Sequence, residues 1–258
     1  MPYKRYDIKN KYNYRGRRVN EHVVLKTFML FFIPVLILIV MGLGILLAYR
    51  VEVGPLFDDS SDATVDQVQI VSDEELLIVV NNHNQINADY VPELRDLAGI
   101  QVSEIAYDNL LSLTSDAAAD GVNISISAGY VSYDQQNVLY EETFKKLKED
   151  KKISNIKAES ETRKICPEAG SSESQTGLLI KFSTSEVHED FSDTAASVWL
   201  EHNAVNYGFI LRYPEDEEVI TGMAYAPDYY RYVGKEHALN IRRYDMTLEE
   251  YSSHVSQR

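Results

Sequence analysis

Residues 172–181 read SESQTGLLIK, a polar segment that ends at Gly177 and continues into the apolar residues Leu178, Leu179 and Ile180. A short apolar run after a turn residue is typical of a buried strand. We therefore predict a strand over 177–182. The preceding residues 150–172 are polar and predict a surface loop.

The segments on either side of this stretch alternate between strand-like and helix-like patterns. Further strands are predicted at 76–80, 122–126, 208–211 and 229–233, from short apolar runs or alternating apolar residues. Helices are predicted over 105–120, 133–150 and 194–206, with a last short helix after a capping box of Thr247 and Glu250. Because helices and strands are mixed without a regular βαβ alternation, the expected class is α+β, in one domain of about 185 residues.

Residues 27–49, TFMLFFIPVLILIVMGLGILLAY, contain no charged side chain. A run of about 20 apolar residues is long enough to span the hydrocarbon core of a bilayer as a helix. The run is longer than the roughly 7–15 apolar residues of a signal peptide, and no small-x-small cleavage pattern follows it. We therefore predict an uncleaved transmembrane helix. The basic residues before it place the N-terminus in the cytoplasm and the C-terminal domain outside.

This prediction divides the chain into four parts: a basic cytoplasmic tail (1–26), the transmembrane helix (27–49), an acidic linker (50–73) and an extracytoplasmic domain (74–258). The tail contains eight basic and two acidic residues, which give it a charge of +6. Because the net charge of the whole chain is −15, the rest of the chain has a charge of −21. The overall acidic balance argues against nucleic acid as the main partner. The expected location is the cell membrane, with a single span.

Four segments of the domain follow a recognisable order. They are LIVVNN with DYVPEL (77–82 and 89–94), AGYVSYDQQ (128–136, against a pattern SGYRSYxxQ), the stretch 172–181 (against SEHQTGLAVD), and a last group that includes APDYYRYVG (226–234, against EPWHFRYVG). Together they resemble the zinc D-alanyl-D-alanine carboxypeptidases of the VanY type, which have the hedgehog/D,D-peptidase fold. The resemblance covers roughly residues 75–252, and several motifs in fixed order make a chance match improbable.

The resemblance implies a catalytic zinc held by the His and Asp of SEHxxGxxxD and the His of EPWH, with the Glu of EPWH as general base. In this sequence Ser174, Lys181 and Tyr229 stand at the ligand positions, and Ala226 stands at the position of the base. The Arg of SGYRS, which in the family contacts the substrate carboxylate, is replaced by Val131. Since a lysine ammonium repels Zn²⁺ and alanine carries no proton, we expect no bound zinc, no other cofactor and no catalytic residue.

Other residues of the motifs keep side chains that suit a binding cleft. The resemblance suggests substrate contacts for Tyr130, Ser132, Gln136, Ser172 and Glu173, with hydrogen bonding within the scaffold as an equal alternative. We also hypothesise that Lys181 occupies the vacated metal position and pairs there with Glu173 or Asp228.

Histidine and cysteine offer weak alternatives for a rebuilt site. The cluster His188-Glu189-Asp190 lacks the HExxH spacing of a zinc helix. His237 is expected in a helix with a structural role. The single Cys166 has no histidine near it in the sequence and cannot form an intramolecular disulfide.

Three functions remain open from the sequence. The first is a membrane-anchored pseudoenzyme that binds a cell-wall peptide or an envelope protein of a bacterium without cleaving it. The alternative from the enzyme class is an active zinc D,D- or L,D-carboxypeptidase that trims peptidoglycan stem peptides with non-standard ligands. The third is a structural subunit of an envelope complex. Bound zinc and release of D-alanine discriminate the enzyme from the other two.

Overall fold

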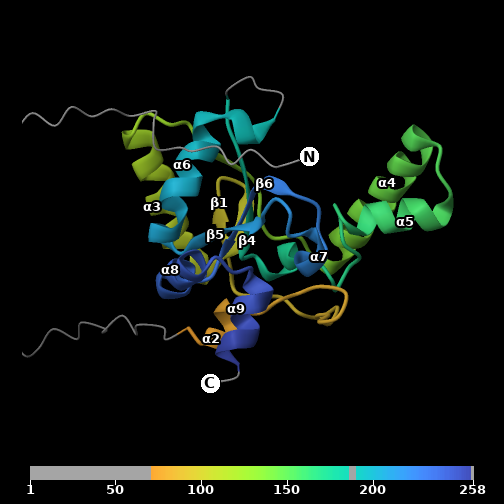
Figure 1. Cartoon of the computed structure of the whole chain (residues 1–258), viewed down its shortest axis with the longest axis horizontal. Helices are drawn as coiled ribbons and strands as arrows, with labels where there is room; N and C mark the ends of the chain where they lie inside the picture. Colours follow the sequence, from red (N-terminus) through yellow and green to blue (C-terminus); the bar gives the residue numbers. More distant parts are fainter. Residues whose placement is uncertain (1–70, 186–189, 257–258) are drawn as a thin grey trace, which may run out of the picture. The chain divides into compact units, whose positions relative to one another are not determined.

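The computed structural model describes residues 71–185 and 190–256 (Figure 1). The predicted tail (1–26) and transmembrane helix (27–49) lie outside these residues, as do most of the linker, His188 and Glu189. Across the described ranges, no helix is both long and apolar enough to cross a membrane.

A four-stranded antiparallel sheet with the order β3-β4-β6-β5 organises the domain. Its strands are β3 (Ser125–Ala128), β4 (Leu179–Ser183), β5 (Phe209–Tyr213) and β6 (Ala226–Tyr232). In the register of β4 and β6, Lys181 lies opposite Tyr229. Residues directly opposite each other in an antiparallel pair present their side chains on the same face. The sheet therefore brings together two positions that are 48 residues apart in the sequence.

Helices surround this sheet and build the core. They are α2 (Asp73–Leu76), α3 (Glu104–Ala119), α4 (Tyr133–Lys151), α5 (Asn155–Arg163), α6 (Ala195–Asn203), α7 (Glu218–Thr221), α8 (Lys235–Tyr244) and α9 (Leu248–Val255). The face of α3 that carries Ala106, Leu110, Leu113 and Ala117 is fully buried, as its helical spacing requires. Figure 1 shows α3 and α6 on one side of the sheet, and α4 with α5 on the other.

Most of the predicted elements are confirmed. The class is α+β, and α3, α4, α6, β4, β5 and β6 occupy the predicted segments. The strand predicted over 122–126 is shifted and forms β3 at Ser125–Ala128. The capping box of Thr247 and Glu250 opens α9, with the backbone N–H of Glu250 donating to Thr247 Oγ1 at 3.3 Å.

Two predicted elements are wrong. Residues 76–80 do not form a strand, because α2 ends at Leu76 and the buried Leu77 and Val80 belong to an irregular segment. Residues 150–172 are not simply a loop, since they contain α5, whose N-cap Ser154 accepts a hydrogen bond from the backbone N–H of Lys157. The hairpin of β1 (Leu94–Leu97) and β2 (Ile100–Ser103) was not predicted.

Candidate functional site

One cleft of about 450 Å³ collects the five positions at which the motifs predict a zinc ligand, the general base or the carboxylate-binding arginine. Its lining includes Val131 before α4, Ser174 in a 3-10 turn (Glu173–Thr176), Lys181 in β4, and Ala226 and Tyr229 in β6. The register of β4 and β6 and the turn before β4 create this convergence. The expectation that Ser174, Lys181 and Tyr229 meet in one cleft is confirmed.

The ammonium of Lys181 is the charged centre of this group. Its Nζ lies 3.5 Å from Oδ2 of Asp228 and 5.0 Å from the centroid of the Tyr229 ring. Burial acts to lower the pKa of Lys181, but Tyr229 and Asp228 outweigh it and raise that pKa above its ordinary value. Lys181 is therefore a cation at neutral pH. The hypothesised pairing with Asp228 is confirmed, and the pairing with Glu173 is wrong.

The Tyr229 hydroxyl is a neutral phenol at neutral pH. Burial raises its pKa, and the nearby Lys181 ammonium offsets only part of that rise. Its ring also packs against the ring of Tyr213, with centroids 6.1 Å apart. A hydroxyl, an ammonium and a neutral phenol differ from the imidazole and carboxylate donors that bind zinc in proteins. Among the described residues, no three His, Cys, Asp or Glu side chains are grouped to hold a metal.

Serine, lysine and tyrosine are also residue types that act as nucleophile and base in covalent catalysis. A lysine or tyrosine accepts a proton only in its deprotonated state. Because the pKa values of Lys181 and Tyr229 are both raised, both groups hold their protons at neutral pH. The arrangement is thus poorly suited to activate the hydroxyl of Ser174.

Glu173 lies behind the cleft, in a buried ion-pair network. Its carboxylate accepts hydrogen bonds from Nε and Nη2 of Arg212 at 2.9 and 2.8 Å, and from Nη1 of Arg231 at 3.3 Å. Arg212 also pairs with Glu249. Burial acts to raise the pKa of Glu173, but the two arginines outweigh it and lower that pKa. The network holds the turn that carries Ser174, and Glu173 is absent from the cleft lining.

The other four residues with suggested substrate contacts are divided between the cleft and its surroundings. Gln136 and Ser172 line the cleft, and Nε2 of Gln136 donates to the carbonyl oxygen of Pro167 at 2.6 Å. Ser132 is the N-cap of α4, where it forms a capping box with Gln135. Tyr130 lines a neighbouring shallow hollow. Substrate contact by these residues stays a prediction.

The second wall of the cleft was not predicted from the sequence. This wall consists of residues 164–167 after α5 and residues 223–225 before β6. The two segments are tied together by the backbone N–H of Ala224, which donates to the carbonyl of Lys164 at 2.8 Å. The signal was the apolar sequence Ile165-Cys166-Pro167 inside an otherwise polar region.

His237 has the expected place in a helix, α8. Its Nδ1 lies 3.0 Å from the hydroxyl of Tyr251 and its Nε2 lies 3.2 Å from Oδ1 of Asp73. These contacts join α2, α8 and α9, and they lie outside the cleft lining. The histidine is a packing residue of this part of the domain.

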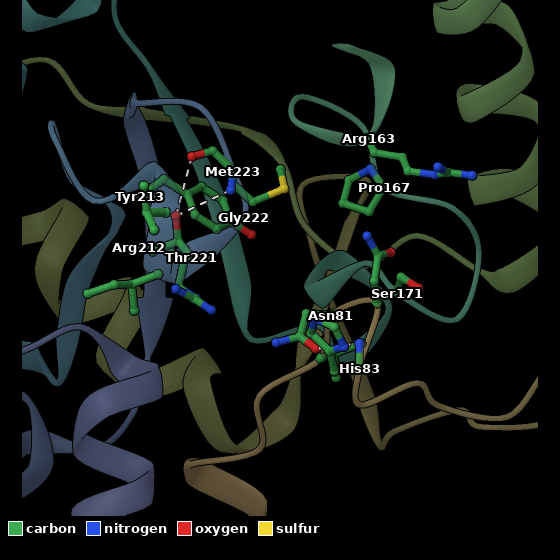
Figure 2. A pocket seen from close by; sticks show the side chains of 14 residues that line it. Asn81, His83, Arg163, Pro167, Ser171, Arg212, Tyr213, Thr221, Gly222 and Met223 are labelled. Carbon is green, nitrogen blue, oxygen red and sulfur yellow. Dashed lines mark hydrogen bonds between the residues drawn. The ribbon is translucent and has the colours of Figure 1, made fainter. Parts of the chain in front are cut away.

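A smaller cavity of about 140 Å³ adjoins the cleft, since Pro167, Tyr213 and Met223 line both. Figure 2 shows Tyr213, Thr221, Gly222 and Met223 on one side of this cavity, and Pro167 and Ser171 on the other. Val219 and Ile220 of α7 also line it, and we call it the α7 cavity.

Comparisons with known proteins agree with the motifs. Residues 99–235 match the family VanY, D-alanyl-D-alanine carboxypeptidase. The Bacillus subtilis protein YodJ is 32% identical over 209 residues, which are 75% of this chain and 73% of that protein. A D-alanyl-D-alanine carboxypeptidase of Enterococcus faecalis is 37% identical over 177 residues, covering 68% of this chain and 65% of the relative.

Solved structures are similar over the same region. A VanY D,D-pentapeptidase carrying a glutamate-to-alanine mutation, in complex with Zn(II), superposes with a TM-score of 0.64 and 33% identity, covering 69% of this chain and 99% of that chain. The LdcB LD-carboxypeptidase superposes with a TM-score of 0.60 and 32% identity, covering 69% of this chain and 86% of that chain. Sequence and fold lead to one conclusion: this chain belongs to the VanY family of D-alanyl-D-alanine carboxypeptidases.

Proposed function

We propose that this chain is a membrane-anchored, non-catalytic member of the family, and that its cleft binds a peptide segment without cleaving it. The segment belongs to a cell-wall peptide or to an envelope protein. The observation that carries the proposal is the ammonium of Lys181 in the cleft. Lys181 stands at one of the family's ligand positions, and it is paired with Asp228.

Electrostatics explains why this lysine opposes metal binding. Two unit charges about 4 Å apart interact by roughly 4 kcal/mol at the effective dielectric near a protein surface, and a dication doubles that figure. The raised pKa of Lys181 means that deprotonation does not remove the repulsion near neutral pH. Asp228 offsets the charge of Lys181 itself, and neither Ser174 nor Tyr229 supplies a further negative charge for the metal.

The catalytic machinery is incomplete apart from the metal. Ala226 has no group that takes a proton from water, and Val131 has none that pairs with a terminal carboxylate. The cleft nevertheless keeps a volume of about 450 Å³ and a polar lining that includes Gln136 and Ser172. A pocket that is retained without its reactive groups suits binding better than turnover.

The membrane anchor is part of the proposal. Its support is the uncharged run 27–49, preceded by a tail with eight basic residues. A protease added outside intact cells is expected to degrade the C-terminal domain and to spare an epitope fused to residue 1. Loss of the epitope without permeabilisation would refute this orientation.

The absence of catalysis is tested on the full chain in detergent micelles. A pentapeptide that ends in D-Ala-D-Ala and the tetrapeptide that lacks its last residue are incubated with the protein, with added zinc or with a chelator. We expect no D-alanine above the protein-free blank in any arm. Release that zinc supports and the chelator abolishes would establish the alternative, an active D,D- or L,D-carboxypeptidase with non-standard ligands.

A further inference from the structure

The cleft is the middle member of three hollows that share lining residues. It shares Pro167, Tyr213 and Met223 with the α7 cavity. It shares Val131 and Leu139 with a shallow hollow on α4, which Tyr130 and Val138 also line and which we call the α4 hollow. The three hollows therefore adjoin one another in the order α7 cavity, cleft and α4 hollow, with Lys181 in the central one, and we call them together the track.

Large apolar side chains gather along this track. Twelve large apolar side chains are exposed among the described residues, and six of them line the three hollows: Val138, Leu139, Ile165, Val219, Ile220 and Tyr225. Val219 is 96% exposed and Val138 is 56% exposed. Exposed apolar side chains gathered around a cleft favour a site that binds a partner.

The charges of the central cleft have one sign. Lys164 and Lys181 line it, and no Asp or Glu does so in the described part of the chain. Their present partners, Glu218 and Asp228, lie outside the lining. The side chains of Lys181 and Asp228 are 38% and 22% exposed, and partly exposed ion pairs exchange partners at little cost. A ligand carboxylate can therefore take the place of Asp228 at Lys181.

We infer that this track docks an extended segment of a partner protein in which a carboxylate side chain is flanked by large apolar side chains. The inference rests on the proposed function, since the cleft must bind without cleaving. Alanine-terminated stem peptides carry only methyl groups in their last positions and would leave the apolar walls uncovered. A protein segment with leucine or phenylalanine beside an aspartate covers both the apolar walls and the ammonium of Lys181.

The test measures fluorescence anisotropy with the full chain in detergent micelles, and micelles without protein give the blank. The probe is a dye-labelled, amidated peptide Leu-Phe-Asp-Leu-Phe. The comparison peptides replace Asp by Asn, replace the four apolar residues by Ala, or are the stem pentapeptide ending in D-Ala-D-Ala. We expect the probe to bind at least about tenfold more tightly than each of them.

Matched variants locate the binding on the track. Val138→Gln is expected to weaken probe binding about fivefold, because it removes apolar contact from the α4 hollow. Val198→Gln is the control, because the two valines have similar exposure: Val198 on α6 is 54% exposed and Val138 on α4 is 56% exposed. Val198 lines none of the three hollows. The control is expected to bind like the wild type.

Three results would overturn the inference: no binding of the probe, equal losses in the two variants, or tighter binding of the stem pentapeptide. In the last case the proposed function stands, with a cell-wall peptide as the occupant. Release of D-alanine in the separate turnover assay would instead refute the proposed function itself. The failures of the two claims are thus distinguishable.

Discussion

The ammonium of Lys181 lies 3.5 Å from a carboxylate oxygen of Asp228, and these residues belong to the paired strands β4 and β6. The resemblance of the motifs implies a carboxylate ligand at the position of this lysine, and Asp228 neutralises the charge of Lys181. The site is therefore electrostatically balanced by its own side chains. This balance is the physical basis for proposing a cleft that keeps the family's shape and lacks its chemistry.

The buried network behind the cleft predicts a large effect of one substitution. Glu173→Gln is expected to lower the free energy of unfolding by about 3–5 kcal/mol, because Arg212 and Arg231 remain buried with a neutral partner. Urea unfolding followed by the fluorescence of Trp199, the single tryptophan of the chain, measures the change.

The control for this substitution is Glu104→Gln. Glu104 pairs with Arg95 at 3.3 Å, and the side chains of Arg95 and Glu104 are 46% and 40% exposed. Exposed pairs contribute at most about 1 kcal/mol. Equal losses in the two variants would contradict the structural role of the buried network.

Low pH is expected to destabilise the domain through protonation of Glu173. The pKa of Glu173 is lowered in the folded protein, because the two arginines outweigh its burial. A carboxyl with a lowered pKa stabilises the fold above its unfolded pKa, here about 4.5, and loses that contribution as the pH falls toward the folded value. Urea unfolding at a series of pH values should show a steep loss below about 4.5. In Glu173→Gln this loss should be shallower, and an identical slope would refute the assignment.

Alanine substitutions at two glycines distinguish the free-energy cost of backbone strain from that of steric overlap. Gly208 and Gly222 both have positive φ, at +86° and +72°. A Cβ at Gly208 would lie 2.9 Å from both the carbonyl carbon of Gly234 and Cε2 of Tyr232, whereas nothing lies within 4 Å at Gly222. Gly222→Ala is expected to cost about 1–2 kcal/mol from backbone conformation alone. Gly208→Ala should cost about 1–3 kcal/mol more from overpacking, as measured by urea unfolding. Equal losses of unfolding free energy in the two variants would contradict the predicted steric cost at Gly208.

The single cysteine provides a probe of the cleft wall. Burial raises the pKa of Cys166, and hydrogen bonds from Thr143 and Gln136 offset only part of that rise. Less thiolate is then present near neutral pH, so that alkylation by iodoacetamide should be slower than that of glutathione. Mass spectrometry over a pH series gives the rate, and Cys166→Ser is the blank. A rate equal to that of glutathione would contradict the burial of the Cys166 thiol.

The sequence predicted those features that depend on local chemistry or on several motifs in order. The helix predicted over 105–120 is observed as α3 at Glu104–Ala119, and the capping box was sufficient to place the start of α9. The alignment of motifs correctly predicted that Lys181 and Tyr229 meet.

The remaining features depend on tertiary packing. Leu77 and Val80 of the apolar run 76–80 are buried in an irregular segment, and periodicity does not distinguish such a segment from a strand. In α5 only Ala158 and Thr162 are buried, so that its sequence lacks an apolar stripe. The second wall of the cleft was missed for the same reason, since it follows that helix.

The measurement that tests the central claim most directly is the zinc content of the purified full chain after dialysis against zinc. We predict no stoichiometric zinc in the wild type. A variant that restores the family's ligands, with Ser174→His, Lys181→Asp and Tyr229→His, should bind about one zinc per chain at the same cleft. Trp199 fluorescence confirms that both proteins are folded. If the wild type bound one zinc per chain and Ser174→Ala lost it, the proposal that this cleft holds no zinc would be wrong.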